Sequence, residues 1–225
     1  MSAYDVLDAR GVTRLCHFTK LQGLTHILSS VEGILASSSI RADIKNVTDN
    51  QRYDGELEYI CCSIEYPNSW FLDKAIQRNT DQIFKDWVTL YIDLTVLKTR
   101  ESKYCSCNAA KDWGRYIFDD ESHVDTLFAS PALLGWQRTP QMLNCCPTND
   151  QAEILIKHSI PRNFIIGIVA GNEEIAESIS SILTTYKMIY GVPTIPIYIS
   201  QDIMSTNWSS MVRNGERPIE RKFDS

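Results

Sequence analysis

The chain has 225 residues, of which 44% are hydrophobic and 22% are charged. This balance excludes a disordered or fibrous protein, and the length suits one compact domain with its own buried core. The formal net charge of −6 excludes capture of DNA or RNA by bulk positive charge, so any contact with nucleic acid must be local.

The N-terminal residues and the cysteines indicate the compartment. Residues 1–14 carry mixed charge and no apolar core, and no later segment reaches the roughly 18 apolar residues that span a bilayer. Seven cysteines are an odd number, and the adjacent pairs Cys61-Cys62 and Cys145-Cys146 bridge internally only with difficulty. We therefore expect reduced thiols in a cytoplasmic protein. Neither these pairs nor Cys105-Ser106-Cys107 have the C-x₂-C spacing of a zinc site, and we expect no metal.

The first half of the chain predicts strands and helices in alternation. Residues 13–17 indicate a short strand, and apolar residues at helical spacing follow until Gly33 ends that helix. The polar residues 41–55 suit a loop over a site. Three more elements are expected here: a buried strand over 58–65, a helix capped by Ser69, and a strand over 88–97.

The second half is less regular. Residues 98–147 have no clear periodicity apart from a short helix near 124–128, and long irregular stretches in compact domains usually serve function. The later elements are expected to be a strand over 152–156, a strand over 164–169, an amphipathic helix on Ile175, Ile179, Ile182 and Leu183, and an edge strand over 194–199 that contains Pro196. Strands and helices mix without a regular βαβ repeat, which predicts an α+β fold.

The C-terminal residues carry charge of both signs. Basic and acidic side chains interleave there: Arg213, Glu216, Arg217, Glu220, Arg221, Lys222 and Asp224. Mixed charge is typical of solvated surface, so we expect a solvated tail and not a patch that binds nucleic acid.

Three polar clusters border the apolar strands. No Gly-x-Gly-x-x-Gly, Walker loop or His-Glu-x-x-His occurs, which excludes the familiar dehydrogenase, NTPase and zincin sites. The clusters are residues 16–19 (CHFT), 49–55 (DNQRYDG) and 148–153 (TNDQAE). Glu153 opens an apolar strand, and Gln151 is expected on the same side of it because side chains alternate. A carboxylate there is either functional or an edge-strand group in water or a salt bridge.

These clusters, in this order, resemble the DarT family of NAD⁺-dependent ADP-ribosyltransferases that modify nucleic acids. The family's opening His-x-Thr is matched by His17-Phe18-Thr19, and its Arg in an Asp/Asn-rich loop by Arg52 with Asp54-Gly55. A strand ending in Pro-Asn is matched by Tyr66-Pro67-Asn68, and the late Gln-Ala-Glu by Gln151-Ala152-Glu153. The resemblance runs from about residue 13 to 169. It implies one ADP-ribosyltransferase domain over 1–225, with a mixed sheet, flanking helices and a core at about 13–200.

The resemblance also implies roles for these residues, with NAD⁺ as co-substrate and no metal. His17, Thr19 and Gln151 would bind NAD⁺, the first two on its adenosine side. Arg52 would reach the pyrophosphate or the nicotinamide ribose, because its planar fork suits phosphate oxygens; otherwise it is a surface arginine. Glu153 would bond the ribose 2′-hydroxyl, stabilise the oxocarbenium-like state and take a proton from the attacking base.

An acceptor strand would lie between residues 107 and 150. The side chains there that could stack on an unpaired base or meet its phosphates are Lys111, Trp113, Arg115, Tyr116, Trp136 and Arg138. For any one of these aromatic rings, core packing is the more common explanation, because large rings are usually buried. The implied partners are single-stranded DNA, which is favoured, or RNA, together with an antitoxin protein. The implied role is that of a toxin or phage-defence effector, and thymine and guanine both stay open as the target base.

Three further functions fit the residues less well. A thiol enzyme would need Cys16 and His17 as nucleophile and base, but adjacent residues on a strand point in opposite directions. A transferase that acts on RNA or protein would use the same clusters with a different acceptor. An inactive relative would only bind nucleic acid or a partner protein, and the presence of both Arg52 and Glu153 argues against it.

Overall fold

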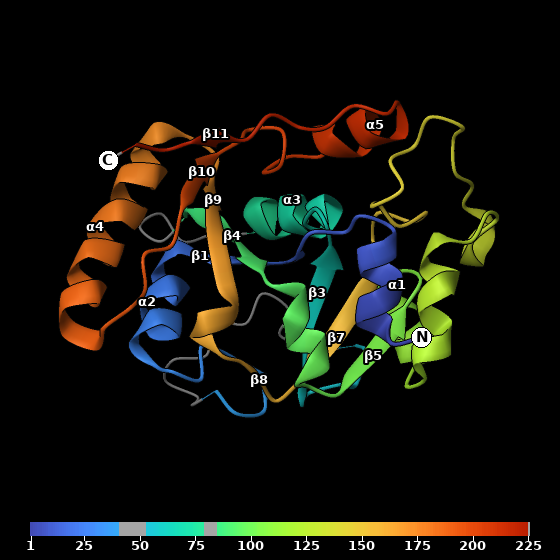
Figure 1. Cartoon of the computed structure of the whole chain (residues 1–225), viewed down its shortest axis with the longest axis horizontal. Coiled ribbons are helices and arrows are strands. Elements are labelled where there is room, and N and C mark those ends of the chain that lie inside the picture. Colours follow the sequence, from blue (N-terminus) through green and yellow to red (C-terminus); the bar gives the residue numbers. More distant parts are fainter. Residues whose placement is uncertain (41–52, 79–84, 225) are drawn as a thin grey trace.

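A computed structural model describes residues 1–40, 53–78 and 85–224 (Figure 1). The strands of its main sheet are β1 (Leu15–Lys20), β3 (Tyr59–Ile64), β4 (Trp87–Ile92), β5 (Ser102–Cys105), β6 (Ile117–Phe118), β7 (Glu153–Lys157), β9 (Ile165–Ala170), β10 (Ile197–Ile199) and β11 (Arg221–Lys222). Their order across the sheet is β11-β10-β9-β4-β1-β3-β7-β5-β6, and a separate short ladder joins β2 (Ile34–Leu35) to β8 (Ser159–Ile160). Of these pairings, β9 with β10 is parallel and the others are antiparallel.

The helices lie around this sheet. They are α1 (Ala3–Ala9), α2 (Leu21–Ser29), α3 (Ser69–Arg78), α4 (Glu173–Tyr190) and α5 (Asn207–Arg213), with 3₁₀ turns at Leu94–Lys98, Lys111–Gly114, Glu121–Phe128, Leu133–Gly135 and Arg162–Phe164. Figure 1 shows α2 beside α4 at one end of the sheet and α1 beside the green 121–128 turn at the other. In the described ranges, none of the helices has the length and apolar character needed to cross a lipid bilayer.

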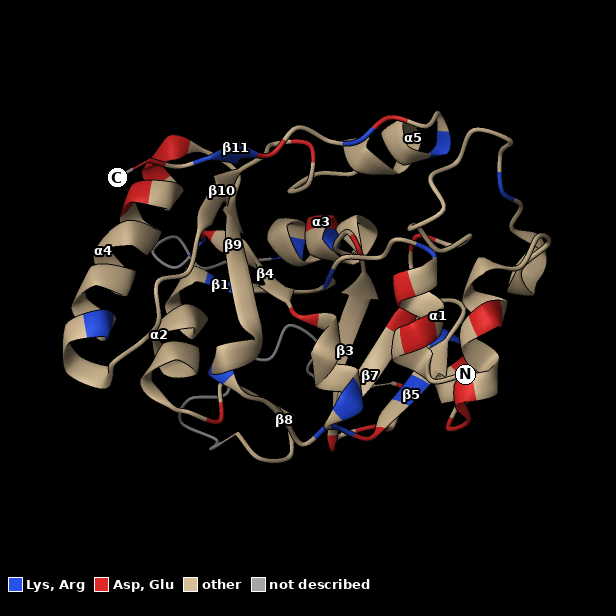
Figure 2. Ribbon diagram, in the orientation of Figure 1, with Lys and Arg blue, Asp and Glu red and all other residues tan. Residues whose placement is uncertain are grey.

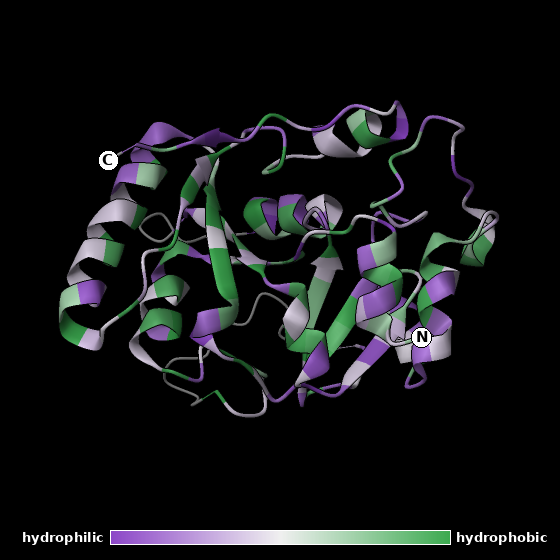
Figure 3. Ribbon diagram, in the orientation of Figure 1, coloured by the Kyte–Doolittle hydropathy of each residue, from purple (hydrophilic) through white to green (hydrophobic). Residues whose placement is uncertain are grey.

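Apolar burial explains the middle strands. All six residues of β4 are buried, as are four of the five residues of β7. Figure 3 shows long hydrophobic stretches of ribbon in this part of the sheet, on β7 and β9. Strands buried on both faces appear in sequence as continuous apolar runs, which is why both were predictable.

The sheet divides between β1 and β3. Strand β1 pairs with β4 along its whole length, from Leu15 opposite Ile92 to Lys20 opposite Trp87. It pairs with β3 only at Leu15 and Cys16, whereas β3 continues to pair with β7. The backbone after Cys16 therefore moves away from β3 and opens a gap in the middle of the sheet.

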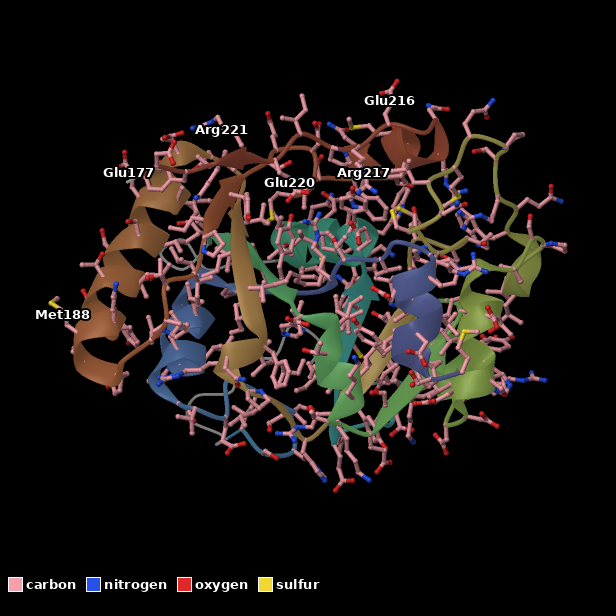
Figure 4. The ribbon with its side chains drawn as sticks, viewed as in Figure 1. Glu177, Met188, Glu216, Arg217, Glu220 and Arg221 are labelled. Carbon is pink, nitrogen blue, oxygen red and sulfur yellow. The ribbon has the colours of Figure 1, made fainter. Side chains whose placement is uncertain are left out.

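The joint where β1 and β3 still pair is held by a partly buried ion pair and by hydrogen bonds. Thr13 donates its backbone N–H to Glu65 Oε2 at 2.7 Å, and Arg14 donates Nε–H to the Glu65 carbonyl at 2.9 Å. The Arg14 guanidinium also makes two bonds to Glu220, at 3.0 and 2.6 Å, and lies 3.8 Å from the centre of the Tyr91 ring. Figure 4 labels Glu220 on the C-terminal segment that crosses this region. The C-terminal segment thus fastens the closed end of the gap.

Several predicted boundaries were wrong for local reasons. The strand expected over 88–97 ends at Ile92, because Asp93 accepts a bond from Thr95 N–H at 2.8 Å and starts a 3₁₀ turn. Helix α3 is capped by Asn68, whose Oδ1 accepts from Phe71 N–H at 3.1 Å, and Ser69 is its first residue. The opening strand is Leu15–Lys20 instead of 13–17.

The C-terminal end of the chain also differs from its prediction. The strand expected at an edge is β10, which starts after Pro196 and lies between β9 and β11. The charged C-terminal residues Glu216, Arg217, Arg221, Lys222 and Asp224 are exposed as expected. Arg213 instead lies at the end of α5, and Glu220 packs inward and bonds Arg14. A charged residue that pairs with a residue of opposite charge can pack against a sheet. The sequence pattern does not distinguish such a residue from one that is exposed to solvent.

Close backbone approaches give a test of the fold. Gly33 has φ +65°, and a Cβ there would lie 2.3 Å from the Ile160 carbonyl oxygen, whereas at Gly11 (φ +74°) nothing lies within 4 Å. Gly11→Ala should cost about 1 kcal/mol through its left-handed backbone alone. Gly33→Ala should cost roughly 2 kcal/mol more, because the β2–β8 ladder must also move. Urea unfolding measures both, and equal losses would contradict the close approach.

Candidate active site

A cavity of about 490 Å³ opens where β1 and β3 part. Its walls come from β1, α2, the turn that follows α2, β3 and the start of β7. Among its lining residues are His17, Thr19, Cys61, Ser63 and Glu153. The gap in the sheet is therefore a pocket, and polar side chains from three strands reach it.

Glu153 is a buried carboxylate in this wall. It is the first residue of β7, it is 6% exposed, and its neighbours across the sheet are Ser63 on β3 and Cys105 on β5. Its Oε2 accepts the backbone N–H of Ala109 at 2.7 Å. Charge-assisted bonds of this kind are stronger than neutral ones and fix the direction of a carboxylate. The strand pairing on both sides leaves Glu153 little freedom to move.

Gln151 differs from its predicted position. It is half-buried and lies in the turn before β7, outside the described lining of the cavity. Its backbone N–H donates to Asn149 Oδ1 at 3.0 Å, and Ala152 N–H donates to the Asn149 carbonyl at 3.0 Å. Strand alternation cannot place residue 151 because the strand begins only at Glu153.

His17 and Thr19 line the cavity from β1. His17 Nδ1 lies 3.0 Å from the Cys61 carbonyl oxygen across the gap. Since a carbonyl only accepts, Nδ1 carries the proton in this bond. Thr19 lies against α2, where a Cβ on Gly23 would be 2.6 Å from its Oγ1. The absence of a side chain at Gly23 therefore sets the place of the Thr19 hydroxyl.

Arg52 lies outside the described residues, but the residues that follow it reach the site. Asp54 lines the cavity and is 9% exposed, and its Oδ1 accepts Glu56 N–H at 3.1 Å. A Cβ on Gly114 would meet the Asp54 carbonyl oxygen at 2.5 Å, so the 111–114 turn packs directly on this segment. The end of the Asp/Asn-rich loop thus lies between the cavity and the region predicted to hold an acceptor.

Trp113 and its neighbours form an exposed group beside the cavity. Trp113 is 77% exposed, and its ring meets that of Tyr53 edge-on with centroids 5.0 Å apart. Tyr116 donates its hydroxyl to Asp112 Oδ2 at 2.9 Å, and Arg115 is exposed between them in sequence. Asp112 and Trp113 both have left-handed backbones, with φ 48° and 62°. Such conformations cost roughly 1–2 kcal/mol each outside glycine and often mark functional sites.

Trp136 and Arg138 lie away from the described lining of the cavity. Trp136 is 38% exposed, and the Arg213 guanidinium lies 5.2 Å from the centre of its ring. Arg138 donates to the Leu143 and Cys146 carbonyls, each at 2.7 Å. Burial, followed by the nearby Arg10 charge, lowers the pKa of Arg138. The Arg138 guanidinium therefore holds a loop in place, and a phosphate would compete with those carbonyls.

The contact between Ala109 and Glu153 was not predicted. A backbone N–H carries no sequence signal, and the pairing of β5 with β7 that brings it there could not be read from the short strand Ser102–Cys105. Tyr53, which meets Trp113, was also missed. Its place next to Arg52 in the polar loop was the one available signal.

The thiols have structural positions. Cys16 donates its thiol to the Glu65 carbonyl at 3.3 Å, and burial raises its pKa. The His17 ring contacts Cys61 instead, which agrees with opposite directions for residues 16 and 17. In the parts of the chain that the structure describes, no group of three or more His, Cys, Asp or Glu side chains is placed to hold a metal ion.

Known proteins share this fold. Thermus sp. 2.9 DarT in complex with ADP-ribosylated ssDNA aligns with a TM-score of 0.62 at 15% identity, covering 85% of this chain and 96% of that one. The same enzyme in complex with NAD⁺ gives 0.57 at 17% identity, covering 84% and 96%. Thermosipho africanus DarTG in complex with ADP-ribose gives 0.56 at 16% identity, covering 85% and 51%. These likenesses confirm the predicted ADP-ribosyltransferase fold.

The sequence comparison identifies the family. No curated protein matches the chain. The family described as DarT, ssDNA thymidine ADP-ribosyltransferase, matches residues 16–205, which include every cluster on which the resemblance was based. The predicted family and enzyme class are therefore confirmed, and the chain belongs to the DarT family of ssDNA thymidine ADP-ribosyltransferases.

Proposed function

We propose that this chain transfers ADP-ribose from NAD⁺ to a thymine base of single-stranded DNA in the cavity between β1 and β3, with Glu153 as the catalytic carboxylate. One observation supports this most strongly. A carboxylate that is only 6% exposed lines a cavity in a divided sheet and is held there by Ala109 N–H. The family description gives thymidine as the acceptor.

NAD⁺ would lie along β1. His17 and Thr19 would bind its adenosine side, and Gln151, from the turn before β7, would join them on the dinucleotide. Arg52 would reach the pyrophosphate or the nicotinamide ribose, and this role is supported by Asp54, two residues later, in the cavity wall. The bound NAD⁺ and ADP-ribose in the Thermus and Thermosipho structures agree with a dinucleotide in this fold.

Glu153 would act in two steps of one transfer. The bond from the ribose C1′ to nicotinamide breaks and leaves positive charge on the sugar. A carboxylate about 4 Å away is worth roughly 4 kcal/mol at an effective dielectric near 20, which is about a thousandfold in rate. A new bond then forms from C1′ to the thymine nitrogen that carries hydrogen, and that proton passes to Glu153 directly or through one water.

The acceptor strand would contact Trp113, Arg115 and Tyr116 beside the cavity, with Trp136 and Arg138 further along. Exposed aromatic rings stack on unpaired bases without needing a basic surface. Figure 2 marks acidic residues on α1 and near the start of α4, so a DNA strand would be held locally and not by the whole surface.

The biological role proposed is that of a toxin or phage-defence effector restrained by an antitoxin protein. The name of the Thermosipho relative, DarTG, supports a toxin with a paired partner.

Labelled NAD⁺ with matched oligonucleotides tests the acceptor. We expect transfer to single-stranded DNA that contains thymine and none to the same strand with every thymine replaced by cytosine. Transfer that follows guanine, or that needs RNA or protein, would replace the proposed acceptor. No transfer to any of them, with NAD⁺ still bound, would favour an inactive binding protein.

Removal of the carboxylate tests the catalytic role. Glu153→Ala should lower the transfer rate about a thousandfold, while NAD⁺ binding measured by calorimetry stays within a few-fold. Glu177→Ala is the matched control, since that glutamate is exposed on α4 (Figure 4). A Glu153→Ala enzyme with the wild-type rate would exclude this residue as the catalytic group.

The packing of Thr19 on α2 gives a second test. Gly23→Ala would force the Thr19 hydroxyl to rotate away from its place in the cavity. Loss of one hydrogen bond of about 0.5–1.5 kcal/mol should weaken NAD⁺ binding roughly three- to tenfold, with the fold intact. Gly171→Ala is the control, because a Cβ there makes only ordinary contact with Met204, at 3.7 Å. Equal NAD⁺ affinity in both variants would argue against a role for Thr19.

The exposed aromatic group gives a third test. Stacking is worth about 1–3 kcal/mol per base, so Trp113→Ala should raise the KM for the oligonucleotide by roughly fivefold or more without changing NAD⁺ affinity. Tyr190→Ala removes a ring that is 44% exposed at the end of α4 and serves as control. If both variants had the wild-type KM, Trp113 would not contact the acceptor.

A further inference from the structure

Helix α5 lies beyond the part of the chain that matches the family, which ends at residue 205. It nevertheless contacts the turn that leads into β7 and Glu153. None of its residues lines the described cavity. Its contacts therefore bear on the catalytic residue only through that turn.

The first contact is made by Ser209. Its hydroxyl donates to Asp150 Oδ2 at 2.5 Å, and Trp70 Nε1 donates to the same oxygen at 3.4 Å. Asp150 is 4% exposed, and its other oxygen, Oδ1, is buried without a hydrogen-bond partner among the described residues. A buried carboxylate with so few partners depends on each of them. Ser209 makes the shorter of the two bonds.

The second contact is made by Arg213. Its Nη2 donates to the Thr148 carbonyl at 2.9 Å, and its Nη1 donates to the Gln137 carbonyl at 3.3 Å. The same guanidinium covers the Trp136 ring. Arg213 therefore ties the turn before β7 to the segment that carries Trp136.

The turn is held rigidly, so that a change in these contacts would displace Glu153. Thr148, Asn149, Asp150 and Ala152 are all buried, with Thr148 and Ala152 at 0% exposure. The Asn149 side chain and carbonyl close the turn through the next three residues. A shift of Asp150 would thus move the start of β7, where Glu153 lies.

We propose that Ser209 and Arg213 are positioning residues for Glu153, so that α5 sets the place of the catalytic carboxylate without touching substrate. The inference rests on the proposed function of Glu153. A misplacement of about 1 Å can cost on the order of a hundredfold in rate, and partial loosening of this turn is expected to cost about tenfold.

Four single variants test the proposal, each compared with wild type and with Glu153→Ala. Ser209→Ala and Arg213→Ala should each lower kcat for transfer to thymine-containing DNA about tenfold, with the dissociation constant of NAD⁺ within twofold. Ser209→Thr keeps the hydroxyl and should restore kcat to within about twofold. Ser210→Ala is the matched control, because Ser210 is exposed and its hydroxyl bonds the Asn207 carbonyl within the helix.

A double-mutant cycle tests the route through Asp150. If Ser209 acts on Glu153 through that carboxylate, Ser209→Ala should lower kcat little further in an Asp150→Asn background. Additive losses would overturn this route. Thermal unfolding of every variant shows whether the folded state is retained.

The outcomes separate this inference from the proposed function. Wild-type kcat in both Ser209→Ala and Arg213→Ala would overturn it, as would a fall in kcat matched by an equal loss of NAD⁺ affinity, which indicates general structural damage. Failure of Ser209→Thr to restore kcat would also overturn it for Ser209. An active Glu153→Ala enzyme would instead refute the proposed function itself.

Discussion

The early separation of β1 from β3 is the constraint on which the site depends. A β-strand that loses its neighbour leaves backbone groups without ladder bonds, and buried groups of this kind must find other partners. Here the His17 ring takes one of them by donating to the Cys61 carbonyl. Helix α2 approaches β1 closely at Gly23, where no side chain intervenes, and forms part of the wall of the resulting gap. The cavity thus lies within the sheet itself, and α2, the turn that follows it and Asp54 complete its walls.

A catalytic carboxylate in such a gap must be both buried and directed. Glu153 meets the first condition through the two strands that flank β7, and the second through the Ala109 N–H. Donors and acceptors that are already in place need not reorganise as charge develops on the substrate, which is how most electrostatic stabilisation by enzymes is achieved. In the proposed mechanism, the buried turn from Thr148 to Ala152 would serve the same purpose one step further from the substrate.

Much of this could be predicted from sequence, because side-chain pattern reports burial. The apolar runs located β3, β4, β7 and β9, and the cluster order gave the family and Glu153 as the candidate. The side-chain pattern does not show which strands pair with each other. Neither the gap after Cys16 nor the contact from Ala109 to Glu153 could therefore be predicted. The side-chain pattern also fails to locate the ends of elements, where a single side chain can determine the boundary. Asp93 ends β4, and Gln151 lies in the turn before β7 and not on that strand. Arg52 lies outside the described residues, so its role stays a prediction.

An acidic enzyme that modifies DNA must obtain its selectivity without bulk attraction. With a formal net charge of −6, a duplex gains little from counterion release at this surface. A single strand offers in addition its unpaired bases, and an exposed ring such as Trp113 can bind those at low entropic cost. The left-handed backbones of Asp112 and Trp113 hold that ring outward against Tyr53. If Trp113 takes its proposed role, repulsion of the duplex and stacking of the open base would act together, and both would favour single-stranded acceptors.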